Sequence, residues 1–129
     1  MSAFDPLETF VQLTDGPDAL PLAVTPEFWQ MLETRDDLKG GRLVSAYRFT
    51  EDWTNWERHP AGDELVIQIS GAIDFVLQRP DGEHVVPLRG RAAVVVPCGV
   101  WHTARVLEPS EAIFVTRGDG TEHRPLQRD

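Results

Sequence analysis

Four side chains of the kind that bind metal ions flank two turns of this sequence. Glu57 and His59 lie two residues apart, and Glu64 follows the next turn. His102 lies much further along the chain, directly after a Pro-Cys-Gly turn. In a β-strand, residues i and i+2 face the same side, so Glu57 and His59 are expected to share a face. If the intervening turn makes a hairpin, Glu64 returns beside His59. Two imidazoles with one or two carboxylates suit Fe, Mn, Ni or Zn.

The elements that must position these residues are short strands. From residue 42 onward, runs rich in Val, Ile, Phe and Trp alternate with turns that contain Gly, Pro and Asp. This spacing predicts an antiparallel sandwich or a closed barrel. The expected strands are 43–49, 56–59, 64–70, 73–78, 85–88, 92–96, 101–107 and 112–117.

The first 41 residues read differently. Residues 1–24 predict extended chain with one short strand near Phe10 to Leu13 and a turn at 20–22. A helix is expected to begin at Thr25-Pro26-Glu27, because Thr can cap a helix and Pro suits its first position. We expect this helix to end near the two glycines at 40–41.

Two segments resemble the sequence motifs of the cupin family, G-x5-H-x-H-x(3,4)-E-x6-G and G-x5-P-x-G-x2-H-x3-N. The segment E-x-H-x4-E-x6-G, from Glu57 to Gly71, has the spacing of the first motif. The segment P-x-G-x2-H, from Pro97 to His102, matches the core of the second. The resemblance covers roughly residues 42–117.

The chain also departs from these motifs. Glu57 replaces the first histidine, and Glu51 stands where the first motif opens with glycine. In the second motif the leading glycine is displaced by one position, to Gly90, and the closing asparagine is Val106. A carboxylate at position 57 would make the site harder and more anionic than a three-histidine site.

The resemblance implies an all-β fold, a cupin-type double-stranded β-helix (jelly-roll barrel) with one short N-terminal helix. We expect one domain, 1–129, with a barrel core at 42–117 and an N-terminal extension at 1–41. The implied ligands of one divalent metal ion are His59, Glu64 and His102. Glu57 is either the fourth ligand or a group that orients His59 from behind.

The function implied by the resemblance is metal-dependent catalysis on a small, oxygen-rich molecule. Dioxygenation ranks first by weight of family membership alone, and isomerase or lyase chemistry ranks next. The same scaffold supports all of these reactions, so the fold does not choose among them. The alternative is a non-catalytic module that binds or senses a metal or a small ligand. Four protein ligands that close the site would favour that alternative, whereas an open coordination position would favour an enzyme. If no metal binds, the four side chains are ordinary barrel residues.

The strand that begins at Glu64 carries further residues on both of its faces, and alternatives stay open for each face. Gln68 shares the face of Glu64 and is expected either to line a substrate pocket or to fill the core. The opposite face carries Leu65, Ile67 and Ile69, which need a cover. Either the N-terminal helix or a second subunit could supply it, and we expect a homodimer.

The other chemically active side chains have structural interpretations. The single cysteine, Cys98, is expected to pack in its turn. His84 and His123 lie among turn residues and are expected at the surface. Trp56 and Trp101 neighbour inward-facing ligands and should face away from the metal.

Composition limits the partners. The net charge of −9 supplies no basic face for nucleic acid or for an anionic membrane. No run approaches the roughly 18 apolar residues of a membrane span, and no signal peptide is visible. With a single cysteine, the chain is expected to be a soluble cytoplasmic protein. Nucleotide-binding glycine motifs and a serine nucleophile elbow are absent from the sequence.

Overall fold

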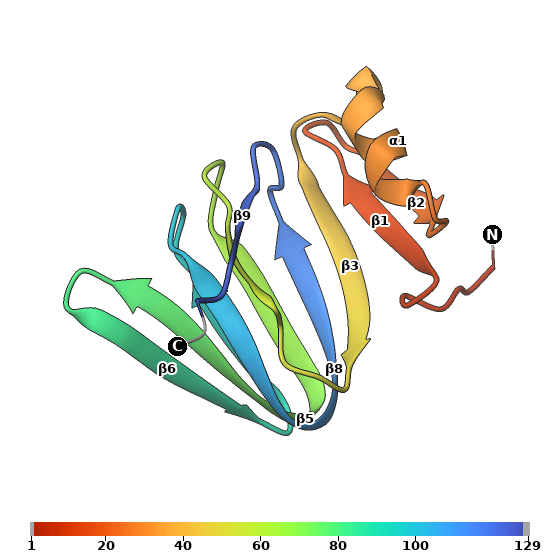
Figure 1. Ribbon diagram of the computed structural model, residues 1–129. Coiled ribbons are helices and arrows are strands. Elements are labelled where there is room, and N and C mark those ends of the chain that lie inside the picture. Colours follow the sequence, from red (N-terminus) through yellow and green to blue (C-terminus); the bar gives the residue numbers. More distant parts are fainter. Residues whose placement is uncertain (1, 128–129) are drawn as a thin grey trace.

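The computed structural model describes residues 2–127, which are mostly β-strand. This part of the chain forms nine strands, one α-helix and one 3₁₀-helix (Figure 1). The strands are β1 Thr9–Leu13, β2 Ala19–Ala23, β3 Arg42–Phe49, β4 Asn55–Arg58, β5 Glu64–Arg79, β6 Gly82–Arg89, β7 Ala92–Val96, β8 His102–Thr116 and β9 Glu122–Pro125. The helices are α1 Phe28–Thr34 and the 3₁₀-helix Asp36–Leu38. The prediction of an all-β chain with one short helix is confirmed.

A long ribbon of β5 and β8 organises the barrel. At one end Leu65 lies opposite Val115, and at the other end Leu77 lies opposite His102. Glu64 and His102 therefore begin strands at opposite ends of the same antiparallel ribbon. The sequence predicted two strands in place of each of these, and the structure joins each pair into one bent strand.

The bend in the ribbon lies at the middle of β5. The pairing register with β8 shifts between Gln68 and Ile73, around Gly71. Gly71 has a φ of 99°, a conformation that side chains disfavour, and a Cβ there would collide with Ser110. The Ala72 backbone N–H donates to the Ser110 hydroxyl over 2.9 Å, which holds the two strands together at this point. The ribbon can thus curl until its two ends approach each other.

Strand β4 does not form the hairpin with β5 that the sequence suggested. It pairs with β8, where Glu57 lies opposite His102, and with β9. Residues 65–68 of β5 already pair with β7 on one side and with β8 on the other. Because both edges of β5 are occupied there, the turn at 60–63 carries the chain across the barrel instead.

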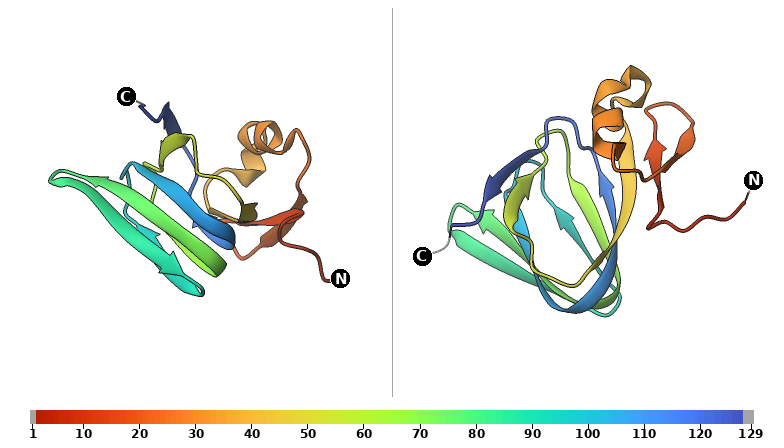
Figure 2. Two further views of the ribbon diagram at one scale, coloured as in Figure 1. Left: turned by 60° about the horizontal axis from the view of Figure 1, so that its bottom comes forward. Right: turned by 45° about the vertical axis from the view of Figure 1, so that its right-hand side comes forward.

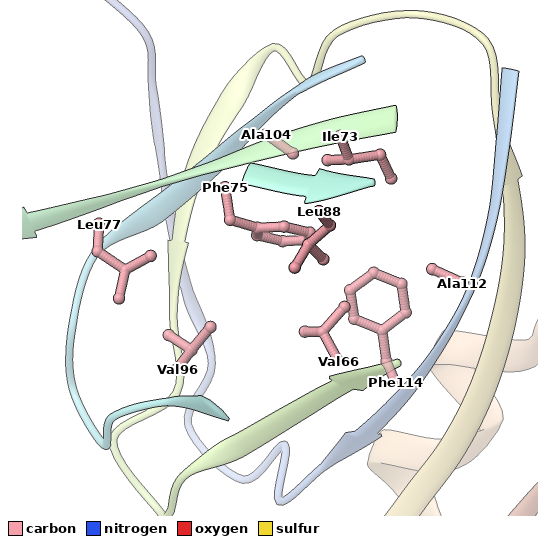
Figure 3. Packing of buried hydrophobic residues seen from close by; sticks show 9 residues of the cluster. All are labelled: Val66, Ile73, Phe75, Leu77, Leu88, Val96, Ala104, Ala112 and Phe114. Carbon is pink, nitrogen blue, oxygen red and sulfur yellow. The ribbon is translucent and has the colours of Figure 1, made fainter. Parts of the chain in front are cut away.

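The apolar core fills the interior between these strands. Figure 3 shows side chains from β5, β6, β7 and β8 pointing toward one another. The buried cluster consists of Val66, Ile73, Phe75, Leu77, Leu88, Val96, Ala104, Ala112 and Phe114. Its members alternate along β5 and β8 with residues that face outward, as expected for a barrel wall.

The N-terminal hairpin and helix lie to one side of the barrel (Figure 2). Strand β1 extends the sheet beside β3, and Phe28 of α1 is buried against Phe10 and Leu43. The turn expected at 20–22 is wrong, since these residues belong to β2. Pro21 is tolerated because β2 is an edge strand with β1 as its one neighbour.

The helix is shorter than the sequence suggested. It begins at Phe28 and ends at Thr34, and the 3₁₀-turn at 36–38 leads to Gly40. Its N-cap is Glu27, and no side chain makes a capping hydrogen bond, so the expected Thr25 cap is wrong. Within residues 2–127, no helix is long and apolar enough to cross a bilayer.

Candidate metal centre

The four predicted ligand residues converge inside the barrel. His59 Nε2 lies 2.8 Å from Glu57 Oε1 and 3.1 Å from Glu64 Oε2. His102 Nε2 lies 3.3 Å from Glu64 Oε1, and the two imidazole centroids are 5.4 Å apart. The convergence has two sources. The curl of the ribbon brings Glu64 to His102, and the pairing of β4 with β8 places Glu57 beside His102.

Three of these residues, Glu57, His59 and His102, offer ligand atoms that all lie within 4.8 Å of one another. Glu64 contacts both histidines from the facing strand. The side chains of His59, Glu64 and His102 are almost fully buried, whereas Glu57 keeps 25 % of its side chain exposed. The cluster therefore has a closed inner side and a partly open side at Glu57.

Hydrogen bonds behind the histidines fix their orientation. His102 Nδ1 lies 3.0 Å from the Val100 carbonyl, which can only accept, so Nδ1 carries a proton. His59 Nδ1 lies 2.8 Å from the Thr121 hydroxyl, whose own proton is donated to the Gly118 carbonyl over 2.8 Å. His59 Nδ1 is thus also the donor. Both rings consequently direct Nε2 toward the carboxylates, the arrangement in which imidazole binds a metal.

The electrostatics of the cluster are those of a strongly anionic pocket. Burial by itself lowers the pKa of His59, but Glu57 and Glu64 outweigh it and raise the pKa to about 9. Burial likewise raises the pKa of Glu64, but His102 and His59 outweigh it and lower the pKa to about 2. The carboxylates therefore hold a positive charge at Nε2 of His59 when no other cation is there.

A proton alone does not satisfy this cluster. His59 Nε2, His102 Nε2 and Glu64 Oε1 are buried and lack an aligned hydrogen-bond partner. Their contacts are 2.8–3.3 Å long, but none of them is an aligned hydrogen bond to these three atoms. Buried polar atoms without partners are rare and costly. The residues fit a divalent cation, because two neutral imidazoles and two carboxylates are a suitable donor set for one.

A cavity of about 930 Å³ reaches the cluster from outside. Glu57, His59 and Glu64 form part of its wall, so molecules that enter the cavity meet the ligand atoms directly. The remaining wall includes residues of β1, α1 and β8, the inward row of β3, the loop after the 3₁₀-helix, Trp53, and the turn that precedes β9. This access favours a site with an open position over a closed structural one.

Gln68 and Cys98, which the sequence also singled out, make contacts away from the cluster. The Gln68 amide donates to the carbonyls of Gly71 and Gly90, over 3.0 and 2.8 Å, and Gln68 is not among the cavity-lining residues. It holds the bend of β5. Cys98 is exposed, and its thiol donates to a backbone carbonyl in the turn at 60–63.

The tryptophans and the remaining two histidines lie outside the ligand set. Trp101 stacks against two arginine side chains, and neither Trp56 nor Trp101 lines the cavity, which agrees with their predicted outward direction. His84 is exposed and contacts Asp81. His123 is exposed as predicted, yet its Nε2 lies 3.2 Å from Glu57 Oε2, so it also borders the cluster.

Three residues at the site were missed by the sequence reasoning. Thr116 donates to Glu64 Oε2 over 2.5 Å, Thr121 accepts from His59, and His123 contacts Glu57. All three belong to the C-terminal end of the chain. The turn glycines at 118 and 120 signal a reversal before β9, but no local pattern reveals that the next strand pairs with β4. That pairing joins residues more than sixty positions apart.

No protein-family model and no curated protein matches this sequence. Solved structures do. A cupin-2 domain protein from Shewanella frigidimarina shares 18 % identity, with a TM-score of 0.50 over 57 % of this chain and 68 % of that one. Hydroquinone 1,2-dioxygenase from Sphingomonas sp. TTNP3, with 4-hydroxybenzoate bound, shares 17 %, with a TM-score of 0.51 over 58 % of each chain.

A deletion mutant of the Bacillus subtilis oxalate decarboxylase OxdC is similar over 67 % of this chain, with a TM-score of 0.57 and 16 % identity. The match spans 24 % of that enzyme's length, and less than two-thirds of the dioxygenase. Identities this low establish a likeness of architecture and leave the activity open. The chain therefore has the cupin fold.

Proposed function

We propose that this protein is a metal-dependent enzyme that acts on a small molecule, with dioxygenase-like chemistry ranked first and isomerase or lyase chemistry next. One observation carries the proposal. His59 Nε2, His102 Nε2 and Glu64 Oε1 are buried without aligned partners, and they converge with Glu57 beside an open cavity that Glu57, His59 and Glu64 line. Fold alone does not choose the reaction, but both dioxygenase and oxalate-converting enzymes are found among proteins of similar structure.

Different residues of the chain would bind the ion, orient its imidazole ligands and exclude water. His59, His102 and Glu64 would hold the ion, with Glu57 as a further ligand at the open side. Thr121 and the Val100 carbonyl keep the two imidazoles in the ligating tautomer. The aromatic side chains of Tyr47, Phe49, Trp53 and Phe114, which line the cavity, would exclude water from the bound substrate. A bound divalent ion supplies Lewis acidity or redox chemistry at the cavity end of the site.

The second candidate is a non-catalytic binding or sensing module. The observation in its favour is the number of ligand-type residues, since four protein ligands suffice to close a tetrahedral zinc site. Coordination number separates the two candidates. A five- or six-coordinate ion that includes water supports the enzyme, and a closed four-coordinate ion with protein ligands alone supports the module.

Metal analysis tests the proposal. The purified chain should bind one Fe, Mn, Ni or Zn ion per molecule after reconstitution, as measured by elemental analysis after gel filtration. Glu57→Ala and His59→Ala should lower the affinity for that ion. His84→Ala is the matched control, because His84 is an exposed histidine that contacts Asp81 and does not line the cavity. Failure of the wild-type chain to retain any of the four metals would overturn the proposal.

We further propose that the protein works as a homodimer. The outer face of β5 and β7 carries apolar side chains that α1 leaves uncovered, and Leu65, Ile69 and Val95 are 36 %, 46 % and 56 % exposed. A contiguous apolar face of this kind suits a second copy of the chain. A monomeric mass by sedimentation equilibrium at micromolar concentration would contradict it. A cytoplasmic location stays a prediction from the single cysteine.

A further inference from the structure

We propose that the cavity selects an uncharged molecule with a flat, ring-sized body and discriminates against small dianions. This inference rests on the proposed metal-dependent function and specifies the substrate class of the same site. It is carried by two features of the cavity wall: a continuous group of aromatic rings and the nearly complete lack of cationic side chains near the ligand atoms.

The aromatic group begins on the inward row of β3. Tyr47 and Phe49 are two residues apart and face the interior, with ring centroids 5.7 Å from each other. Phe49 lies 5.9 Å from both Trp53 and Phe114, and Trp53 lies 6.2 Å from Phe114. All four rings line the cavity. Tyr47, Phe49 and Trp53 are only partly buried, so their faces are available to stack on a flat ligand.

This aromatic group lies next to the proposed metal site. The Trp53 ring centroid is 6.1 Å from that of His102, and the same cavity wall includes Glu57, His59 and Glu64. A molecule with oxygen ligands at one end and an unsaturated ring at the other would therefore meet both regions at once. The cavity volume of about 930 Å³ accommodates a body larger than a two-carbon acid.

The charge of the wall opposes an anionic ligand. Glu57 and Glu64 already balance a divalent ion, so a dianion would leave the site with excess negative charge. Within residues 2–127, no arginine lines this cavity, and Glu33 and Asp119 add further negative charge. The one lysine, Lys39, is 61 % exposed and lies 3.0 Å from Asp36.

The polar groups of the wall can orient an uncharged ligand. Ser45 and Tyr47, which both carry a hydroxyl group, line the cavity. Burial raises the pKa of Tyr47 to about 12, so this hydroxyl keeps its proton and can donate to a carbonyl or hydroxyl oxygen. His123 is the remaining basic group at the wall, and it already faces Glu57. Hydroxyl donors without a paired cation recognise neutral oxygens rather than carboxylates.

Isothermal titration of the zinc-loaded protein with three probes tests this inference, since zinc binds without turning over a redox substrate. The probes are α-hydroxyacetophenone, hydroxyacetone and oxalate. The first two share one uncharged pair of vicinal oxygens and differ in the ring, while oxalate carries two charges. We expect α-hydroxyacetophenone to bind roughly tenfold more tightly than hydroxyacetone, because of stacking, and more tightly than oxalate.

A pair of variants assigns the effect to the wall. Phe49→Leu should weaken α-hydroxyacetophenone roughly tenfold and leave zinc and hydroxyacetone binding unchanged. Phe4→Leu is the matched control, because Phe4 is 47 % exposed and does not line the cavity. Loss of zinc binding in the wild type would remove both the proposed function and this inference. Zinc binding with oxalate as the tightest probe, or without an effect of Phe49→Leu, would overturn this inference alone.

Discussion

The two ends of the barrel interior are built from the same strands. They differ in whether their buried side chains find suitable partners, apolar contacts at one end and hydrogen bonds at the other. On β5, Glu64 and Val66 are inward neighbours, and on β8 the same holds for His102 and Ala104. Val66 and Ala104 belong to the cluster of buried apolar side chains that forms the core. Two residues away, Glu64 and His102 hold buried atoms that lack aligned partners.

This difference separates stability from function within one fold. Burial of apolar side chains stabilises the core end, at about 25 cal/mol for each Å² removed from water. The ligand end gathers charges whose desolvation offsets much of their mutual attraction, so a buried ion cluster is weak evidence for stability. Changes at the core should therefore alter unfolding most, and changes at the ligand end should alter metal binding most.

The largest effect is expected from Phe75→Ala, at the centre of the core. Phe75 is fully buried and packs edge-on against Trp53, with ring centroids 5.7 Å apart. The cavity left behind should lower the free energy of unfolding by about 3–5 kcal/mol, as measured by urea denaturation of the metal-free protein. Val85→Ala is the control, because Val85 is 49 % exposed. Equal losses in the two variants would contradict the assignment of the core.

Glu64→Gln should lower metal affinity strongly and alter the free energy of unfolding little, the reverse of Phe75→Ala. Glutamine keeps the shape and can still accept from Thr116, but it removes the charge that faces both histidines. We expect the affinity for the bound metal to fall by more than the roughly 10–100-fold typical of losing a group behind a ligand. The unfolding midpoint of the metal-free variant should change far less than that of Phe75→Ala. Chelator competition measures the affinity, and an unchanged value would remove Glu64 from the ligand set.

Metal binding should strengthen with pH up to about 9. The pKa of His59 in the folded chain lies above its ordinary value of 6.5, so in the metal-free protein the proton on His59 adds stability below pH 6.5. That contribution is lost as the pH rises through about 9. A metal ion must displace this proton, which predicts roughly a tenfold gain in affinity for each pH unit in that interval. An affinity that does not vary with pH would contradict the protonated cluster.

At acidic pH, the dependence of stability on pH has the opposite sign, because Glu64 stabilises the fold in its charged form. The pKa of Glu64 is lowered to about 2 from an ordinary value of 4.5, so its charge contributes stability that is present above pH 4.5. This contribution is lost as the pH falls through about 2. Because His59 and Glu64 share one ion pair, Glu64→Gln should weaken both pH dependences together.

The smallest effect is expected behind the ligands, at Thr121. Thr121→Val removes the oxygen that accepts from His59 Nδ1, so the ring loses its fixed orientation. Metal affinity should fall roughly tenfold, and the visible spectrum of the cobalt-loaded protein should shift. Thr121→Ser restores the hydroxyl and should restore both properties. If serine and valine behave alike, Thr121 contributes packing rather than orientation.

Much of the candidate site could be read from local sequence. The i, i+2 spacing predicted that Glu57 and His59 share a face, and the two side chains do meet, although β4 ends at Arg58, one residue before His59. The alternating pattern of β5 placed Glu64 and Val66 inside, and it placed Leu65 outside. These are short-range consequences of strand geometry, which repeats every two residues regardless of what the strand pairs with.

The sequence by itself thus determined an all-β chain, several of its turns, and which residues could bind a cation. The tertiary structure alone decided the strand partners: the curl that joins Glu64 to His102, the crossing of β4 away from β5, and the C-terminal strand that brings Thr121 and His123 to the site. The physical reason is that a strand's inward pattern fixes its faces but not its neighbours. Neighbours depend on which sheet edges remain free once the long ribbon has formed.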